Sequence, residues 1–559
     1  MRRVLVLGVF ALGVLVLVGR AIDLQVLKQD FLRGQGDARH LRVVTMPAHR
    51  GMITDRNEQP LAISTPVDSV WANPRDLPLA DPRLPKLARL LDLDHDEMLR
   101  RLAARETREF VYIRRHIAPE LAAQVLALEL PGVALEREYR RYYPMGEVAA
   151  HVVGFTNIDD RGQEGLELAY DEWLAGVPGA KRVIKDRLGR VVETVEALRA
   201  PRAGKPLALS IDRRIQYLAY RELKQAVQGG GARSGSIVVM DPRTGEVLAM
   251  VNQPAFNPNT RRNLRGDLYR NRGVTDVFEP GSTIKPFTVA AALEAGRYQP
   301  SSQIDTGPGY LRVRGHTVRD IRNYGRIDLA TLMAKSSNVG ASKIALSLEP
   351  EELWSLYSRV GFGRITGVGY PGEAAGVMSD FSRWNEVERA TLAFGYGLSV
   401  TPLQLAQAYS AIAADGMMHE ATFLRRDATA PGQRAMQPET ARQVRAMLEG
   451  VVGTDGTGTR AAVEGYRVAG KTGTVRKSTV GGYVEDRYIA LFAGMAPASN
   501  PRLVVVVMIN EPGREEYYGG HVAAPVFREV MTGALRLLNI PPDDLPALQV
   551  AQPASGGAA

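Results

Sequence analysis

The pattern of apolar and polar positions predicts a membrane-spanning helix at the start of the chain. Residues 4–19 carry no charged side chain, and a partly exposed Arg20 would let the apolar run continue to Ile22. This pattern predicts one uncleaved transmembrane helix over 4–22. A cleaved signal peptide is the alternative, but the GRAIDLQ segment that follows fits a small-x-small cleavage site poorly. Basic residues flank both ends, so charge alone does not determine the orientation.

The stretch that follows is predicted to contain both short strands and helices. Short strand-like runs bounded by turns alternate with two charged amphipathic stretches of helical spacing, near 85–105 and 118–130. The strand-like runs include 50–57 and 183–189. A segment rich in proline and glycine, 201–206, is typical of a linker. We therefore predict a separate pedestal domain before this linker.

After the linker the pattern predicts an α+β domain. A helical period covers 213–227, and two β-prone runs, 235–240 and 246–251, flank the turn-forming Asp-Pro-Arg-Thr-Gly and predict a β-hairpin. Helical segments follow from about 283 to 411, and two more β-rich runs precede a closing helix over 522–538. This order predicts a mixed sheet with helices packed on both sides.

Length and composition agree with several domains in one chain. The chain has 559 residues, of which 45% are hydrophobic and 23% charged, as is typical of globular proteins. The last residues are rich in Pro, Gly, Ala and Ser, which disfavours a packed core. The predicted parts are a cytoplasmic tail at 1–3, a transmembrane anchor at 4–22, the pedestal domain at 23–204, the α+β domain at 205–545 and a disordered tail at 546–559.

Composition also excludes several kinds of site. The chain has no cysteine, so disulfides and thiolate metal sites are excluded. The net charge of +9 would suit an anionic surface or polymer, but no basic run with interleaved aromatic residues appears, so we expect no nucleic acid partner. The eight histidines form no H-E-x-x-H motif, and G-x-S-x-G does not occur.

Candidate chemistry begins at Ser282. Gly281 predicts a tight turn and an apolar helical run follows, so Ser282 should lie at a helix N-terminus, with Lys285 on the same helix face. A serine hydroxyl is a weak nucleophile without an adjacent base, and a buried lysine with a lowered pKa can be that base. A capping serine near a surface lysine has the same spacing, so this pair alone is weak evidence.

Two further polar segments lie later in the same predicted domain. Ser336 and Asn338 can point from a short loop into one cleft, although an ordinary polar turn has the same pattern. The other segment lies among β-prone residues and is placed on a strand, where a lysine and hydroxyls can bind a carboxylate and a glycine lets substrate approach closely. Its residues are Lys471, Thr472, Gly473 and Thr474.

The segment 465–472 also matches the nucleotide-binding pattern G-x-x-x-x-G-K-[ST]. A P-loop opens a helix directly after its lysine. Here Gly473, Thr474 and a glycine pair at 481–482 follow, and no helical period appears before Tyr488. The sequence therefore favours a strand over a nucleotide site.

S-x-x-K, S-x-N and K-T-G in this order within one domain are the signature of the penicillin-recognising serine acyltransferases. Longer segments resemble class B penicillin-binding proteins, and among them most of all the division-specific septal type (the penicillin-binding protein 3 type). In the second domain these segments are Glu279–Phe287, Ser336–Gly340, Gly395–Leu405, Tyr517–Gly520 and Ala524–Phe527. In the pedestal they are Arg50–Asn57, Arg141–Gly146 and Gly162–Glu167.

The resemblance implies the penicillin-binding serine transpeptidase fold and an acyl-enzyme mechanism. Lys285 would take the proton of Ser282, which would attack the penultimate D-alanine carbonyl of a peptidoglycan stem peptide. The oxyanion would lie between the backbone N–H groups of Ser282 and Thr474. Ser336 and the lysines would protonate the departing D-alanine. An amine of a neighbouring stem would then release the acyl group, whereas a β-lactam would stall at this stage.

The resemblance also assigns substrate-binding residues. Asn338 would hold the peptide backbone, and Lys471, Thr472 and Thr474 would face the terminal carboxylate, with Gly473 giving access. No metal or cofactor is implied.

The resemblance further implies a location and partners. It places a single-pass protein in the inner membrane, with its catalytic domain in the periplasm at the division septum. The implied partners are stem peptides, β-lactams, the membrane and division-machinery proteins, including a septal glycosyltransferase of the FtsW type. Three alternatives remain open: a D,D-carboxypeptidase or β-lactamase that uses water as acceptor, the elongation-specific transpeptidase, and a non-catalytic scaffold or β-lactam sensor.

Overall fold

The structure is a computed structural model. It describes residues 2–28, 41–185, 191–260, 266–426, 428, 430–479, 482–513 and 516–545. The predicted tail at 546–559 and the end of the run predicted at 183–189 lie outside these residues. The chain divides into two compact units. Unit 1 contains Met1–Gly51, Ser64–Tyr142 and Glu172–Lys205, and unit 2 contains Met52–Ile63, Tyr143–Asp171 and Pro206–Ala559.

Unit 1 begins with helix α1 (Arg2–Ile22), which continues into a π-helical turn (Asp23–Leu27). The stretch Leu5–Gln25 has a mean hydropathy of 2.5, and none of it is buried. Among the described residues it is the one helix long and apolar enough to cross a membrane. Because about 20 apolar residues in a helix match the hydrocarbon thickness of a bilayer, α1 has the length and exposure expected of the predicted anchor.

The other described residues of unit 1 include two groups of paired strands and several short helices. Strands β1 (Leu41–Met46), β8 (Gly179–Lys185) and β9 (Val191–Arg199) form a three-stranded sheet. Strand β3 (Pro60–Ala72) pairs with β4 (Val111–Ile117) and β5 (Val133–Tyr142). The predicted helical stretches are confirmed as α3 (Leu84–Leu90), α4 (His95–Ala103) and α5 (Pro119–Leu126). Their apolar faces share one core with β3 and β4.

Unit 2 is built on a five-stranded antiparallel sheet. Its order is β12 (Val247–Gln253), β11 (Ser234–Met240), β21 (Leu503–Asn510), β20 (Gly482–Ala496) and β19 (Ala469–Thr479). The predicted hairpin is confirmed, because β11 and β12 pair in an antiparallel register. Strand β19 lies at one edge of this sheet, and that edge carries the candidate site.

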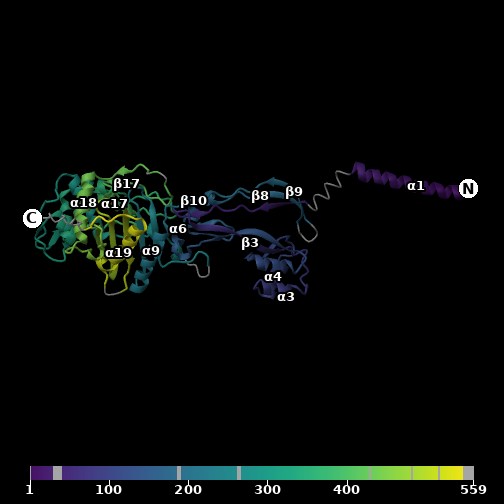
Figure 1. Cartoon of the computed structure of the whole chain (residues 1–559), viewed down its shortest axis with the longest axis horizontal. Helices are drawn as coiled ribbons and strands as arrows, with labels where there is room; N and C mark the ends of the chain where they lie inside the picture. The colour runs from purple at the N-terminus through teal and green to yellow at the C-terminus, as the bar shows by residue number, and fades with distance from the viewer. Residues whose placement is uncertain are drawn as a thin grey trace, which may run out of the picture. The chain divides into compact units, whose positions relative to one another are not determined.

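Helices cover both faces of this sheet, which confirms the predicted layers. Helices α9 (Arg213–Lys224) and α19 (Gly519–Leu537) lie side by side (Figure 1) and contact each other. They share one hydrophobic core with alternate residues of the strands, such as Ile237 and Val507. Helix α17 (Pro402–Ala413) packs against β11, β20 and β21, and every one of its residues is buried. A helix that is buried all round is typical of a central position in the core.

A second group of helices and a small hairpin complete the surroundings of the site. The helices are α12 (Lys285–Glu294), α13 (Leu329–Lys335), α14 (Asn338–Ser347), α15 (Pro350–Arg359), α16 (Glu386–Leu392) and α18 (Pro438–Val452). The hairpin is β14 (Tyr310–Val313) with β15 (His316–Arg319). Smaller elements of unit 2 include α6 (Ala150–Val153), α7 (Gly165–Ala169), α11 (Arg272–Thr275), β6 (Phe155–Thr156) and β7 (Gly162–Glu164).

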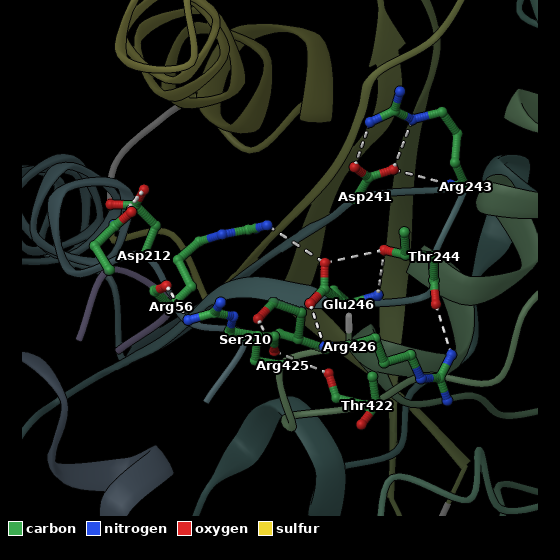
Figure 2. A network of polar contacts seen from close by, with 12 residues as sticks. Arg56, Ser210, Asp212, Asp241, Arg243, Thr244, Glu246, Thr422, Arg425 and Arg426 are labelled. Atoms are coloured by element: carbon green, nitrogen blue, oxygen red, sulfur yellow. Dashed lines mark hydrogen bonds and ion pairs between the residues drawn. The ribbon is translucent and has the colours of Figure 1, made fainter. Parts of the chain in front are cut away.

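Segment 52–63 joins unit 2 through backbone pairing and a polar network. Strand β2 (Ile53–Thr54) pairs in parallel with β10 (Leu207–Ala208). Nearby, Glu246 is only 3% exposed and lies at the centre of the network in Figure 2. Its carboxylate accepts hydrogen bonds from Arg56 at 3.5 Å and from the Arg426 backbone N–H at 3.0 Å. These contacts hold segment 52–63 against the β11–β12 turn.

Candidate active site

Ser282 lies in a short 3-10 turn, Gly281–Ile284, directly before α12. Gly281 has a φ of +54°, and a Cβ there would lie 2.4 Å from Val475 Cγ2, so glycine allows the turn to lie against the edge strand β19. The Tyr409 hydroxyl donates to the Thr283 carbonyl at 2.8 Å and fixes the turn from the other side. Ser282, only partly buried, is therefore held beside β19 at the beginning of a helix.

Lys285 is fully buried one helical turn after Ser282. Its Nζ donates to Ser336 O at 2.6 Å, to Ser336 Oγ at 3.0 Å and to Asn338 Oδ1 at 2.7 Å. Among the hydrogen bonds of the described residues, none joins Lys285 Nζ to Ser282 Oγ. The first two predicted motifs therefore meet, and the lysine amine is anchored on the S-x-N segment.

Ser336 lies between two lysines. Lys471 Nζ donates to Ser336 Oγ at 3.0 Å, the same distance as from Lys285 Nζ. A hydroxyl oxygen has two acceptor positions, so both contacts can form at once. Ser336 ends α13 in the left-handed conformation, with φ 58°. That conformation costs a non-glycine residue roughly 1–2 kcal/mol, and the two lysine contacts help to offset the cost.

The third predicted motif lies on the edge strand β19, which confirms the predicted strand. Lys471 is fully buried and Thr472 is 8% exposed. Thr472 Oγ1 lies 2.8 Å from Thr457 Oγ1, and Thr474 Oγ1 accepts from Gly519 N at 2.9 Å. A Cβ on Gly473 would lie 3.0 Å from Thr283 Cγ2, so a side chain there would crowd the serine turn.

Strand β19 also excludes the nucleotide-binding interpretation of 465–472. The chain after Lys471 stays extended up to Thr479, where a P-loop would begin a helix. All eight predicted site residues thus lie around one edge of the sheet, on the Ser282 turn, the segment after α13, and β19.

Family models agree with this arrangement over most of the chain. A penicillin-binding protein transpeptidase domain matches residues 235–532, and a penicillin-binding protein dimerisation domain matches residues 45–209. The chain is 45% identical over 549 residues to the peptidoglycan D,D-transpeptidase FtsI of Escherichia coli strain K12, which covers 97% of this chain and 93% of the relative. The chain belongs to the class B penicillin-binding proteins.

Other comparisons support the same assignment. Over 544 residues the chain is 43% identical to the probable peptidoglycan D,D-transpeptidase PbpC of Pseudomonas aeruginosa, covering 97% of this chain and 96% of that one. The crystal structure of penicillin-binding protein 3 from Mycobacterium tuberculosis complexed with aztreonam is 30% identical, with a TM-score of 0.70 over 89% of this chain and 98% of that chain. The predicted fold class and the predicted penicillin-binding protein 3 type are confirmed.

The family assignment gives this penicillin-binding protein its reaction class. It is a serine-type peptidoglycan D,D-transpeptidase. The single apolar helix α1 and the FtsI-type relatives indicate a single-pass inner-membrane protein involved in division. The reaction class fits the arrangement of a serine beside buried amines.

The two lysines have an electrostatic environment that suits proton transfer. Burial lowers the pKa of Lys285 well below its usual value, the positive charge of Lys471 lowers it further, and the negative charge of Asp320 opposes both effects. Burial also lowers the pKa of Lys471 to about 7. Two buried ammonium groups on one hydroxyl repel each other, so a neutral amine is present near neutral pH. A neutral lysine amine is the form that can accept a proton from serine.

Asp320 is a residue of the candidate site that sequence reasoning missed. It follows β15, and its carboxylate accepts from Ser337 Oγ at 2.6 Å, Asn338 N at 2.6 Å and Val339 N at 3.0 Å. It thus caps the N-terminus of α14 and holds the S-x-N segment in place. No sequence motif marks an isolated aspartate after a hairpin, and only the folded structure shows that Asp320 lies beside Asn338.

Replacement of Asp320 by alanine should therefore affect both stability and acylation. We expect the free energy of unfolding to fall by about 1–3 kcal/mol, because buried N–H groups lose their acceptor. Acylation by penicillin should slow by about 10- to 100-fold, because Ser336 and Asn338 lose their fixed position. Denaturant unfolding and stopped-flow acylation measure the two effects.

A helix-cap variant provides the control for Asp320→Ala. Asp94 caps α4 in unit 1 by accepting from Glu97 N at 2.8 Å. Asp94→Ala should lose stability at normal acylation rates. If Asp320→Ala behaved in the same way, Asp320 would be a helix cap with no positioning role.

Proposed function

We propose that this penicillin-binding protein cross-links peptidoglycan stem peptides at the division septum through an acyl-enzyme on Ser282. The observation that carries the proposal is the convergence of two buried lysine amines, each 3.0 Å from Ser336 Oγ, beside the turn that holds Ser282. This arrangement provides a nucleophile, a neutral base and a path for the proton in one place.

In acylation, Lys285 accepts the Ser282 proton as Ser282 Oγ attacks the carbonyl of the penultimate D-alanine. The N–H groups of Ser282 and Thr474 stabilise the oxyanion. The C–N bond to the last D-alanine then breaks, and the proton reaches the departing amine through Ser336 and the lysines. The products are an ester on Ser282 and free D-alanine.

Substrate binding uses the edge of β19 and the S-x-N segment. An extended peptide can add to an exposed sheet edge through backbone hydrogen bonds. Lys471, Thr472 and Thr474 face its terminal carboxylate, Gly473 leaves room for it, and Asn338 holds its backbone. Their positions around one sheet edge support these roles.

Deacylation requires an amine from a second stem peptide, which attacks the Ser282 ester and forms the cross-link. A β-lactam enters the same path but leaves an ester that reacts slowly. The D,D-carboxypeptidase alternative differs in one step, because water replaces the amine.

The location follows from the substrate. Peptidoglycan lies outside the cytoplasmic membrane, so α1 anchors the chain with residues 23–545 in the periplasm. In sequence we assign 205–545 to the transpeptidase domain and 23–204 to the pedestal domain, although 52–63 and 143–171 fold with unit 2. We assign to the pedestal the contacts with division-machinery proteins, including a septal glycosyltransferase of the FtsW type, and the FtsI-type relatives support the septal location.

A cross-linking assay tests this function. The full-length protein in detergent, combined with a septal glycosyltransferase and lipid-linked pentapeptide precursor, should yield cross-linked dimers, and benzylpenicillin should abolish them. Chromatography of the digested product measures the amounts of cross-linked dimer and of released D-alanine. About one dimer for each released D-alanine supports transpeptidation.

The alternatives give different products in the same assay. Released D-alanine without dimers would indicate a carboxypeptidase. Neither product from a folded protein that penicillin acylates would contradict cross-linking under these conditions. In dividing cells, a fluorescent fusion spread along the side wall would favour the elongation-specific role over the septal one.

A further inference from the structure

A cavity of about 340 Å³ lies in unit 2, and none of the predicted site residues lines it. Its walls come from the end of β7 with α7, from α10 (Gly266–Tyr269) with α11, and from segment 370–372. The volume falls in the range of about 300–1,000 Å³ that is typical of small-ligand sites. Glu164, from one of the pedestal segments that the catalytic mechanism leaves without a role, lines this cavity.

The Glu164 carboxylate has no partner within the described part of the chain. It forms neither a hydrogen bond nor an ion pair there, and it does not cap α7, which begins directly after it. Burial alone raises the pKa of Glu164. A partly buried carboxylate without a partner is unfavourable, and a bound cation would offset that cost.

Arg270 is the other charged side chain among the described lining residues, and it already has a partner. Its Nε lies 3.0 Å from Asp276 Oδ1, and its Nη2 donates to Asp276 Oδ2 at 3.1 Å. Paired contacts of this kind hold a guanidinium in a fixed geometry. The positive charge of Arg270 is thus directed to Asp276, and the negative charge of Glu164 remains for a ligand.

The backbone on both sides of the cavity is held in place. A Cβ on Gly154 would clash with the Glu164 carbonyl, and Gly165 has a φ of +64°, so these glycines let β7 lie directly against the segment after α6. On the other side, the Tyr370 hydroxyl donates to the His151 carbonyl at 2.5 Å. A cavity with such walls is largely formed before a ligand arrives, which lowers the cost of binding.

The uncharged walls favour a guanidinium over other cations. Tyr269 lines the cavity, and an edge-to-face contact with Phe155, at 5.8 Å between ring centroids, fixes its ring. A guanidinium is planar and less strongly hydrated than an ammonium, so it suits a site that combines a carboxylate with aromatic surface. Leu168 and Pro371 provide apolar surface for the alkyl chain that carries it.

We propose that this cavity binds the guanidinium group of an arginine side chain presented by a partner protein, with Glu164 as its carboxylate partner. Leu168 at the cavity wall is 41% exposed, so the cavity opens at a surface on which a protein segment can lie. The proposal does not depend on the catalytic role of Ser282.

Two matched peptides test the proposal. Both are tripeptides with blocked ends and glycine at either side, and the central residue is arginine in one and citrulline in the other. Citrulline has nearly the same shape but carries a neutral urea, so the peptides differ in one charge. Calorimetric titration into the full-length protein in detergent measures both affinities. We expect the arginine peptide to bind about tenfold more tightly, and Glu164→Gln to reduce this ratio to about one.

Two further variants provide controls. Glu351→Gln removes an exposed carboxylate of α15 that does not line the cavity, and it should keep the tenfold preference. Arg270→Gln removes the cation of the cavity itself and should also keep the preference. Equal affinities of the two peptides for the wild type, or a preference that survives Glu164→Gln, would overturn the proposal.

Spermidine distinguishes a free polyamine from an arginine side chain. If spermidine bound to the wild type and not to Glu164→Gln, while the two peptides bound equally, the cavity would be a polyamine site and the arginine assignment would be wrong. Spermidine that bound more weakly than the arginine peptide would support the assignment.

Thermal unfolding shows whether Glu164→Gln retains the fold. Because the folded pKa of Glu164 lies above the unfolded one, the ionised carboxylate destabilises the folded chain at a pH above both values. Removal of the charge should therefore not lower the unfolding midpoint. A lower midpoint would contradict the unpaired state of Glu164 on which the proposal rests.

Discussion

The Ser282→Ala variant is expected to lose all covalent labelling by penicillin and to keep its fold. Removal of the nucleophile of an acyl-enzyme mechanism lowers the rate by a factor on the order of 10⁴ or more, so no adduct should accumulate. The change removes one partly buried hydroxyl, and the free energy of unfolding should move by less than about 1 kcal/mol. Intact-mass analysis after incubation with penicillin measures the adduct, and thermal unfolding measures the fold.

The exposed Ser301 gives a control, since Ser301→Ala removes the same group at a position outside the predicted site residues. It should show one adduct per chain, like the wild type. An adduct of equal yield on Ser282→Ala would place the nucleophile elsewhere. A well-folded wild type without an adduct would favour the scaffold alternative, which also requires that septation survive Ser282→Ala in cells.

Local patterns account for most of the fold that could be predicted. Alternating and helical periods identified the β11–β12 hairpin, α9 and the closing helix α19, because neighbouring residues determine each of these elements. Such local patterns could not predict that segment 52–63 belongs to unit 2. This placement depends on the parallel pairing of Ile53 with Leu207 and on the contact of Arg56 with Glu246, between residues far apart in sequence.

The candidate site was also predictable only in part. The ordered motifs identified Ser282, Lys285 and Lys471 because each motif is local, and the family resemblance indicated that the motifs form one site. The motifs did not predict that Lys285 Nζ would bond to Ser336 and Asn338, since side-chain contacts across elements depend on packing. They also gave no indication of Asp320, whose role comes from the fold of the β14–β15 hairpin.

The Lys285→Met variant should lose about 10³-fold in acylation rate at neutral pH. Methionine has a similar length and fills the buried space, but it cannot accept the Ser282 proton, and general-base contributions are about 10²–10⁴-fold. Fluorescent-penicillin labelling over time measures the rate. Lys343→Met on α14 is the control, because Lys343 donates to the Asp305 carbonyl and lies outside the predicted site. It should leave the rate within about twofold of the wild type.

The pH dependence of acylation tests the same base in the unchanged enzyme. Because burial and Lys471 hold the pKa of Lys285 well below its usual value, a larger share of its amine should be neutral at a given pH than for an ordinary lysine. Acylation should therefore level off at a lower pH than it would with an ordinary lysine as the base, and its gain between pH 7 and 9 should fall short of tenfold per unit. An ordinary lysine, with a pKa of about 10.4, would give that tenfold gain.

The pH dependence of stability provides an independent measure of the protonation of the buried lysines. Their folded pKa values lie below the unfolded value, so between the two the unfolded chain binds more protons than the folded chain. The resulting destabilisation is fully present below the folded pKa, about 7 for Lys471, and is lost as pH rises toward about 10. The wild type should thus gain stability from pH 7 to 9, and Lys285→Met should gain less. If stability rose equally with pH in the two proteins, Lys285 would have the same pKa in the folded and the unfolded chain. It could not then be the base.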